Sequence, residues 1–196
     1  MRSQVNKLEF LGSFSEKLPQ TGLPEIAFAG RSNVGKSSLL NRLLNRKSAA
    51  RVSSTPGRTQ RINLFRIGDA GVFADLPGYG FARVPHHVRN VWKSVIEAYL
   101  GQREPLCLVV VLVDARRDPM PMDGELIDGL RAAEIPLCVV ATKVDKLKKQ
   151  QRQRQLSLIR KGFGLPAGQP IGFSAVTGEG ADTVWRAIEE AASRGT

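Results

Sequence analysis

One eight-residue segment, GRSNVGKS, constrains this chain more than any other feature of its sequence. It follows an apolar run, EIAFAG, that predicts a buried strand, and it precedes leucines at helical spacing. The pattern G-x-x-x-x-G-K-S between a strand and a helix is typical of a phosphate-binding loop, because its glycines let successive backbone N–H groups surround phosphate oxygens. We expect Lys36 to contact the β- and γ-phosphates of a nucleoside triphosphate and Ser37 to bind Mg²⁺. The candidate nucleotide contacts of this loop are Gly30, Arg31, Ser32, Asn33, Val34, Gly35, Lys36 and Ser37.

The rest of the chain alternates between apolar strand-like runs and helical patterns. This alternation predicts an α/β fold of three layers, in which helices cover both faces of a six-stranded, mainly parallel sheet. We expect strands at 25–30, 61–68, 71–78, 106–114, 136–145 and 170–175, and helices at 36–46, up to about 102, 123–133, 147–161 and 183–194. The weakly patterned residues 1–24 are predicted to form an N-terminal extension that packs on a single domain of residues 25–196.

Two further segments are expected near the γ-phosphate and Mg²⁺. The sequence DLPG ends a predicted strand, with Asp75 placed to hold Mg²⁺ through a water molecule and the Gly78 N–H placed to meet the γ-phosphate. The polar loop 47–60 contains Thr55 and Thr59, either of which could bind Mg²⁺ only while a γ-phosphate is present. Spacing does not choose between them, but the order of this loop would depend on the bound nucleotide.

Two segments later in the chain indicate which base is bound. In the sequence TKVD, the carboxylate of Asp145 can accept hydrogen bonds from N1–H and N2–H₂ of guanine, and the stem of Lys143 can lie along the base. Adenine has no donors at those positions, so a buried acceptor would be left unpaired and ATP would be rejected. A backbone N–H in the segment FSA, residues 173–175, could contact the guanine oxygen. The ordered set of motifs therefore predicts GTP as the ligand.

These segments together carry a family resemblance. The sequences GRSNVGKS, TPGRTQ, DLPGYGFA, TKVD and FSA, in a chain of this length, resemble the EngB/YihA/YsxC family of bacterial GTPases. The similarity covers nearly the whole chain and implies a P-loop GTPase domain that binds GTP or GDP with Mg²⁺. It also implies a role in the assembly of the large ribosomal subunit in the bacterial cytoplasm, with a connection to the cell cycle and septation. The partner implied is a precursor of that subunit, made of rRNA and ribosomal proteins.

The resemblance also assigns site residues. It makes Ser37 and Thr59 the Mg²⁺ ligands. The candidate catalytic residues are Lys36, Thr59, Gly78 and Asn33. Beyond the phosphate-binding loop, the implied nucleotide contacts are Gly57, Arg58, Thr59, Gln60, Arg61, Asp75, Leu76, Pro77, Gly78, Thr142, Lys143, Val144, Asp145, Phe173, Ser174 and Ala175. Thr142 departs from the Asn that is common in GTPases at large but agrees with this family.

Two residues near the phosphates bear on hydrolysis. Many small GTPases have a Gln directly after D-x-x-G that orients the attacking water, whereas this chain has Tyr79, so we expect slow intrinsic hydrolysis. The side-chain oxygen of Asn33 could bind a K⁺ ion that bridges the phosphates, as in several related bacterial GTPases. Asn33 could equally serve only to order the loop, and both interpretations stay open.

The charge of the chain favours a polyanionic partner. Its 29 Lys and Arg residues outnumber 18 Asp and Glu residues, which gives a net charge of +11 and an isoelectric point near 10.3. Two basic clusters follow nucleotide-binding segments and are candidate RNA contacts, although a single charge run is usually just a solvated helix face. The first cluster is Arg83, His86, His87, Arg89 and Lys93, and the second is Lys146, Lys148, Lys149, Arg152 and Arg154.

The sequence also bears on location and redox state. The longest apolar run is strand-sized and the first residues lack the pattern of a secretory signal, so we expect a cytoplasmic monomer with no membrane partner. Cys107 and Cys138 each lie seven residues before an aspartate, Asp114 and Asp145, that ends a predicted strand. If those strands pair in register, the two reduced thiols would lie close together.

Three other functions compete with a ribosome-assembly GTPase. A P-loop kinase or ATPase is opposed by TKVD at the end of a buried strand, and a binding module with a vestigial site is opposed by the intact Lys36, Ser37 and Asp75. A membrane-associated G domain is supported only by the positive charge.

Overall fold

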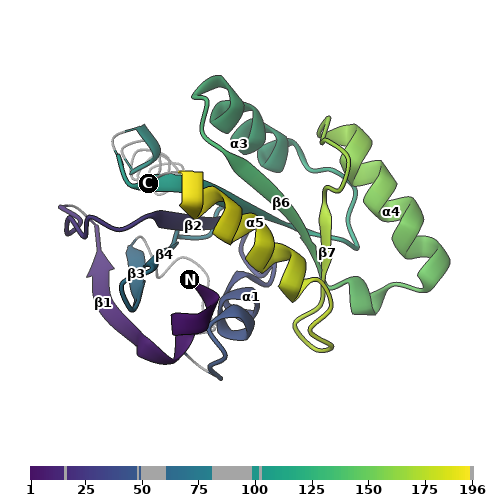
Figure 1. Cartoon of the computed structure of the whole chain (residues 1–196). Coiled ribbons are helices and arrows are strands. Elements are labelled where there is room, and N and C mark those ends of the chain that lie inside the picture. Colours follow the sequence, from purple (N-terminus) through teal and green to yellow (C-terminus); the bar gives the residue numbers. More distant parts are fainter. Residues whose placement is uncertain (16, 48, 50–60, 81–98, 102, 195–196) are drawn as a thin grey trace.

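The protein is built around one twisted sheet. The computed structural model describes residues 1–15, 17–47, 49, 61–80, 99–101 and 103–194 (Figure 1). The sheet has seven strands in the order β1-β3-β4-β2-β5-β6-β7. Their bounds are β1 Leu8–Phe14, β2 Glu25–Gly30, β3 Ile62–Ile67, β4 Gly71–Asp75, β5 Leu106–Asp114, β6 Leu137–Thr142 and β7 Ile171–Phe173. The neighbouring strands β4, β2, β5, β6 and β7 are parallel to one another, whereas β3 runs antiparallel to both β4 and β1. The mainly parallel sheet is confirmed.

Helices cover both faces of the sheet, as the alternating pattern predicts. On one face lie the 3-10 helix η1 (Arg2–Lys7) and the helices α1 (Lys36–Leu43) and α5 (Ala181–Arg194). On the other lie α3 (Pro121–Ala132) and α4 (Lys149–Gly162), while the 3-10 helix η2 (Val144–Lys146) leads from β6 toward α4. Strand β2 divides its side chains accordingly, with Phe28 packed toward α1 and α5 and Ala29 packed toward the other face. The three-layer α/β class is therefore confirmed (Figure 1).

The seventh strand is the main departure from the expected fold. We predicted six strands, but β1 lies within the segment expected to be an extension, and it pairs with the edge of β3 from Leu8↔Ile67 to Phe14↔Ile62. Its side-chain pattern did not indicate a strand, because Phe10 is 57% exposed and the register shifts between Phe10 and Gly12. Backbone pairing with an open edge forms this strand rather than an alternation of buried side chains. The division of the chain at residue 25 stays a prediction.

The predicted helices α1, α3, α4 and α5 lie within a few residues of their expected bounds. Of the helix expected to end near 102, the structure describes residues 99–101, which are helical. The loop with Thr55, Gly57, Arg58, Thr59 and Gln60 lies outside the described residues, as does the first basic cluster. No helix in the described ranges is long and apolar enough to cross a membrane.

Strands β5 and β6 do not pair in the register that would place the two cysteines opposite each other. Strand β6 ends at Thr142 rather than at Asp145, because Lys143 takes a left-handed backbone conformation with φ of 62°. Cys138 therefore pairs with Val110, three residues beyond Cys107. Both thiols are free, and burial raises the pKa of Cys138 to about 11.

Candidate nucleotide-binding site

The predicted phosphate-binding loop connects the end of β2 to the first turn of α1. Gly30 is the last residue of the strand and Lys36 is the first residue of the helix. Gly35 has φ of 109°, a left-handed conformation that strongly favours glycine, and it directs the chain into the helix. The loop therefore lies at the N-terminus of α1, where unpaired N–H groups and the helix dipole favour a bound anion.

The two groups expected at the phosphates and Mg²⁺ lie together. The ammonium group of Lys36 forms an ion pair with the carboxylate of Asp75 at the end of β4, and the two side chains are only 13% and 10% exposed. Asn63 on β3, which pairs in register with Asp75, donates a hydrogen bond from Nδ2 to Oδ2 of Asp75 at 3.4 Å. Ser13 on β1 in turn donates a hydrogen bond to Asn63, so the edge strands support the position of Asp75.

The DLPG segment runs beside the phosphate-binding loop. The N–H of Ser32 donates to the carbonyl of Tyr79 at 2.8 Å, and the N–H of Tyr79 donates to the carbonyl of Gly30 at 3.3 Å. A Cβ atom on Gly78 would lie 3.3 Å from the backbone nitrogen of Ser32, which is closer than most such contacts in proteins. Glycine at position 78 therefore allows two phosphate-directed backbone segments to approach each other.

Tyr79 faces the protein interior. Its side chain is 3% exposed, and its hydroxyl group donates a hydrogen bond of 2.8 Å to the carboxylate of Asp123 in the first turn of α3. Burial, followed by the charge of Asp123, raises the pKa of Tyr79 well above 10. Burial also raises the pKa of Asp123, while the hydrogen bond from Tyr79 and the charge of Arg31 partly offset this increase. The phenol is thus bonded away from the position where a Gln orients water in many small GTPases.

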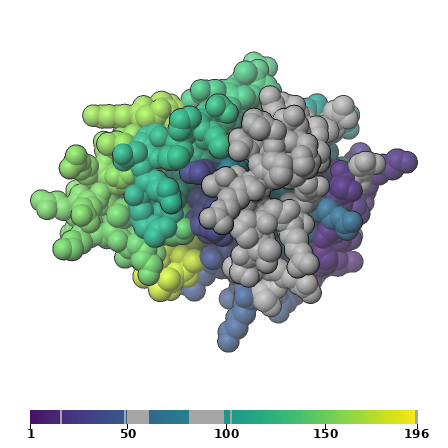
Figure 2. All heavy atoms as spheres, turned by 180° about the vertical axis from the view of Figure 1, so that it is seen from behind, coloured from purple at the N-terminus to yellow at the C-terminus, as the bar shows by residue number. Residues whose placement is uncertain are grey.

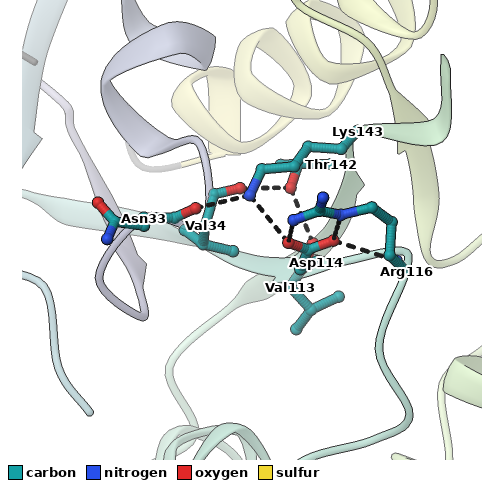
Figure 3. Close-up of polar contacts among 7 residues, drawn as sticks. All are labelled: Asn33, Val34, Val113, Asp114, Arg116, Thr142 and Lys143. Carbon is teal, nitrogen blue, oxygen red and sulfur yellow. Dashed lines mark hydrogen bonds and ion pairs between the residues drawn. The ribbon is translucent and has the colours of Figure 1, made fainter. Parts of the chain in front are cut away.

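The TKVD segment is bonded directly to the phosphate-binding loop (Figure 3). The Thr142 hydroxyl group lies 2.5 Å from the carbonyl oxygen of Val34 and 3.1 Å from that of Val113. The Lys143 ammonium group donates to the carbonyl of Asn33 at 2.6 Å and to the carboxylate of Asp114 at 2.8 Å. Two segments separated by about 110 residues in sequence are therefore held as one unit.

Asp114 and Arg116 belong to this unit, although the sequence analysis did not assign them to the site. Arg116 binds Asp114 through two parallel hydrogen bonds, from Nε to Oδ1 at 2.9 Å and from Nη2 to Oδ2 at 2.7 Å (Figure 3). Burial alone would raise the pKa of Asp114, but the hydrogen bonds from Arg116 and Lys143 hold it well below its usual value. Asp114 therefore stays ionised and fixes the Lys143 ammonium group against the loop. The position of Asp114 at the end of a buried strand, like that of Asp75, is the feature of the sequence that could have marked it as a site residue.

The two segments expected to contact the base lie side by side. Strands β6 and β7 pair Thr142 with Phe173 in register, so the TKVD and FSA segments emerge from the same edge of the sheet. Asp145 lies in η2, where its side chain is 16% exposed and lies 3.8 Å from the ammonium group of Lys146. The N–H of Ser174 is bonded to the carbonyl of Glu179 at 3.1 Å. Within the described part of the chain, no partner is found for the N–H of Ala175, which remains the candidate donor to a guanine oxygen.

The structure thus brings Lys36, Asp75 and Gly78 to one side of the loop and the TKVD and FSA segments, which are expected to contact the base, to the other. Arg61 lies directly before β3 and is exposed, and Ser37 lies in the first turn of α1. The fold and this site define a P-loop protein of the guanine-nucleotide-binding class.

Comparisons with known proteins agree with this class and identify the family. Residues 25–143 match a family model described as a 50S ribosome-binding GTPase. The probable GTP-binding protein EngB of Geobacter sulfurreducens is 49% identical over 193 residues, which cover 97% of this chain and 94% of that one. The protein of the same description from Lactiplantibacillus plantarum is 51% identical over 172 residues, which cover 87% of both chains. This chain belongs to the EngB family of GTP-binding proteins, and it is a GTPase.

Solved structures support the same assignment. The crystal structure of a probable GTP-binding protein EngB matches 87% of this chain and 99% of its own, with a TM-score of 0.72 and 28% identity. The Aquifex aeolicus Era protein bound to GDP and AlF₄⁻ matches 86% of this chain with a TM-score of 0.68. At 24% identity, the likeness to Era shows the shared fold alone.

Proposed function

We propose that this protein uses GTP binding and slow GTP hydrolysis, with Mg²⁺, to control a step in the assembly of the large ribosomal subunit in the cytoplasm. The observation that carries the nucleotide part is the bonding of Lys143 to the carbonyl of Asn33 and to Asp114. It joins the expected guanine-recognition segment to the phosphate-binding loop. The ribosomal part is supported by the description of the matching family model and by the net charge of +11.

In this proposal, Lys36 and the N–H groups before α1 hold the β- and γ-phosphates. Mg²⁺ prefers oxygen ligands, and the structure offers the Ser37 hydroxyl group at the start of α1 as a ligand and the Asp75 carboxylate at the end of β4 to hold the ion through a water molecule. Thr59 would complete the set in the GTP state. Mg²⁺ would neutralise charge that develops on the phosphates during hydrolysis.

The proposed hydrolysis is slow for a structural reason. The Tyr79 hydroxyl group donates to Asp123, and the ring is buried, so this side chain does not orient water as a Gln would. The remaining groups of the chain proposed to act are the Gly78 N–H and Lys36, which stabilise charge on the γ-phosphate. We therefore propose that a bound particle raises the rate.

Both interpretations of Asn33 remain part of the proposal. The residue has φ of 61°, and Asn is among the non-glycine residues that adopt this left-handed conformation most readily, which favours a loop-ordering role. Its carbonyl faces Lys143 while its side-chain amide points away from that group, which leaves the amide oxygen available to a K⁺ ion at the phosphates (Figure 3).

The proposal is tested by binding and by sedimentation. We expect the purified protein to bind GDP and GTP far more tightly than ADP and ATP, as measured by calorimetry. We expect the protein to co-sediment with large-subunit precursors more strongly with a non-hydrolysable GTP analogue than with GDP. If the particle strengthens GTP binding, GTP must strengthen particle binding by the same factor. Tight nucleotide binding without any nucleotide-dependent sedimentation would contradict the ribosomal part.

A further inference from the structure

The helix α4 carries charges of only one sign, which is unusual for a surface helix. Its 14 residues, KQQRQRQLSLIRKG, include five Lys or Arg residues and no Asp or Glu. Helix α5 has the same length but carries three acidic residues and only two arginines. A solvated helix usually mixes both signs, because alternating charges support the helix through i,i+4 pairs. The absence of acidic residues from α4 therefore needs a reason other than solubility.

The cations of α4 flank its outward face. Ile159 is 1% exposed and marks the side that packs on the sheet, together with the half-buried Leu156. With about 100° between successive residues, the opposite side carries glutamines and serine between two rows of cations. The exposed cations are Lys149, Arg154, Arg160 and Lys161, and Lys148 directly precedes the helix. Figure 2 shows α4, in light green, along one edge of the molecule with long side chains extending into solvent.

Not every cation of this region is available to a partner. Arg152 points inward, donating to the carbonyl of Val144 at 3.2 Å and forming an ion pair with Glu179 at 2.6 Å. Arg131 on α3 donates to the carbonyl of Phe163 at the end of α4. Arg152 was among the residues that we expected to contact RNA, and its bonds instead hold α4 to the segment that contains Asp145.

The acidic side chains at the border of α4 are also engaged. Glu179 is paired with Arg152, and Asp118 accepts a hydrogen bond from Gln155 at 3.2 Å. Across the described ranges, Lys148, Lys149, Arg154, Arg160 and Lys161 form no ion pair. We call these five residues the α4 basic face. Unpaired cations on a rigid helix form a surface complementary to a regular array of anions.

We propose that the α4 basic face binds the phosphate backbone of folded RNA in the ribosomal precursor, an inference that rests on the proposed function. Lys149 and Lys161 are 12 residues apart, about 18 Å along the helix, which is long enough to contact several phosphates. The intervening Gln150, Gln153 and Ser157 can donate and accept hydrogen bonds at sugar hydroxyl groups. A membrane surface fits less well, because a helix that binds lipid presents a broad apolar face, whereas the buried Ile159 faces the sheet.

The face is joined to the nucleotide site through short covalent and hydrogen-bonded connections. Helix η2, which contains Asp145, precedes α4 by only two residues, and Arg152 is bonded to Val144 within η2. RNA held by α4 therefore lies near the guanine end of the site. This location is separate from the phosphate end, where Tyr79 and Gly78 lie.

The test compares matched substitutions on two helices. Arg154→Gln with Lys161→Gln, on α4, and Arg186→Gln with Arg194→Gln, on α5, each lower the net charge from +11 to +9. Binding of the GDP-loaded proteins to a fluorescent RNA duplex is measured by anisotropy over a salt series. We expect the α4 variant to bind more weakly at low salt by on the order of tenfold, and the slope of log affinity against log salt to fall by about 1.8. We expect the α5 variant to match the wild type.

A second comparison uses two neighbouring arginines. Arg154→Gln should lower RNA affinity, whereas Arg152→Gln should leave it unchanged and lower the melting temperature, because the Arg152 guanidinium is bonded inside the protein. Equal losses in the α4 and α5 variants, or in both single variants, would overturn the proposal. Binding to vesicles with anionic lipid, but not to RNA, would also overturn it.

Sedimentation with large-subunit precursors separates this inference from the proposed function. If the wild type sediments with the particle and the α4 variant sediments equally well, the α4 basic face is not the interface but the proposed function stands. If the wild type binds the duplex but not the particle, the proposed function fails while α4 remains an RNA-binding surface.

Discussion

The hydroxyl group of Tyr79 donates a hydrogen bond of 2.8 Å to the carboxylate of Asp123, which lies 44 residues later in the chain. This bond connects the residue after the DLPG segment to the first turn of α3. It holds Tyr79 in the interior, and the backbone of Tyr79 is bonded to the phosphate-binding loop. A residue at a position associated with catalysis in other GTPases thus has a structural role here.

The first prediction concerns this bond. Tyr79→Phe should lower the free energy of unfolding by about 1–3 kcal/mol, because it leaves a buried acceptor unpaired. The GTPase rate should change little, since the phenol does not orient water. Asp123→Asn should destabilise less, because its amide oxygen can still accept the bond and a buried charge is removed. Chemical denaturation and single-turnover hydrolysis measure the two effects, and a large loss of rate in a stably folded Tyr79→Phe protein would contradict the prediction.

The second prediction concerns base specificity at Asp145. The wild type should prefer GDP over ADP on the order of 10⁴-fold, because adenine cannot satisfy a carboxylate placed for guanine donors. Asp145→Asn exchanges an acceptor for a donor and should shift the preference toward xanthosine diphosphate. Calorimetry with the three nucleotides measures this, with Asp182→Asn on the exposed start of α5 as a matched control. Comparable wild-type affinity for ADP and GDP would refute the assignment.

The third prediction is a pH dependence caused by Asp114. Its pKa is lower in the folded protein than in the unfolded chain, so its ionised form stabilises the fold at pH values above its ordinary pKa of about 3.9. This stabilisation should be lost progressively as the pH falls below that value, because the unfolded chain takes up a proton at Asp114 while the bonds from Arg116 and Lys143 keep the folded carboxylate ionised. The difference in unfolding free energy between the wild type and Asp114→Asn should therefore shrink between about pH 5 and pH 2. If the difference in unfolding free energy between the two proteins stays constant over this range, the fold does not lower the pKa of Asp114.

The fourth prediction separates the two roles of Asn33. Asn33→Gly keeps the left-handed backbone accessible but removes the amide oxygen, whereas Asn33→Ala removes the oxygen and strains a backbone with φ of 61°. If Asn33 binds K⁺, both variants should lose any stimulation of hydrolysis by K⁺ over Na⁺ at equal ionic strength. If Asn33 only orders the loop, Asn33→Gly should hydrolyse GTP like the wild type in both salts. The rates are measured with and without the ribosomal particle.

Sequence patterns predicted most of the elements because burial leaves a local record. The run LCLVVVLVD is apolar throughout and forms the central strand β5, which is buried on both faces. The leucines after Lys36 recur at helical spacing and form the buried side of α1. The sequence did not predict strand β1, because its side chains alternate poorly between buried and exposed and its strand conformation depends on pairing with the free edge of β3.

The site was predictable in proportion to how local its chemistry is. The phosphate-binding loop and the TKVD segment are each defined by residue types within a few positions, so the sequence alone was sufficient to predict them. Asp114 was missed because its importance comes from Lys143 and Arg116 together, and only the pairing of β5 with β6 brings Lys143 next to it. The roles of Thr59 and the neighbouring loop residues stay predictions.

The sequence by itself determined the class of the protein and predicted a phosphate-binding loop and candidate residues for guanine, because these depend on residue types at fixed short spacings. Only the tertiary structure decided where the long-range polar bonds lie. In the folded protein, Tyr79 points inward and is bonded to Asp123, and Lys143 is bonded to Asn33. Arg152 also points inward, whereas Arg154 is exposed. The physical reason is that such bonds depend on strand order, register and helix rotation. These are set by packing of the whole core and leave no pattern within any single segment of the chain.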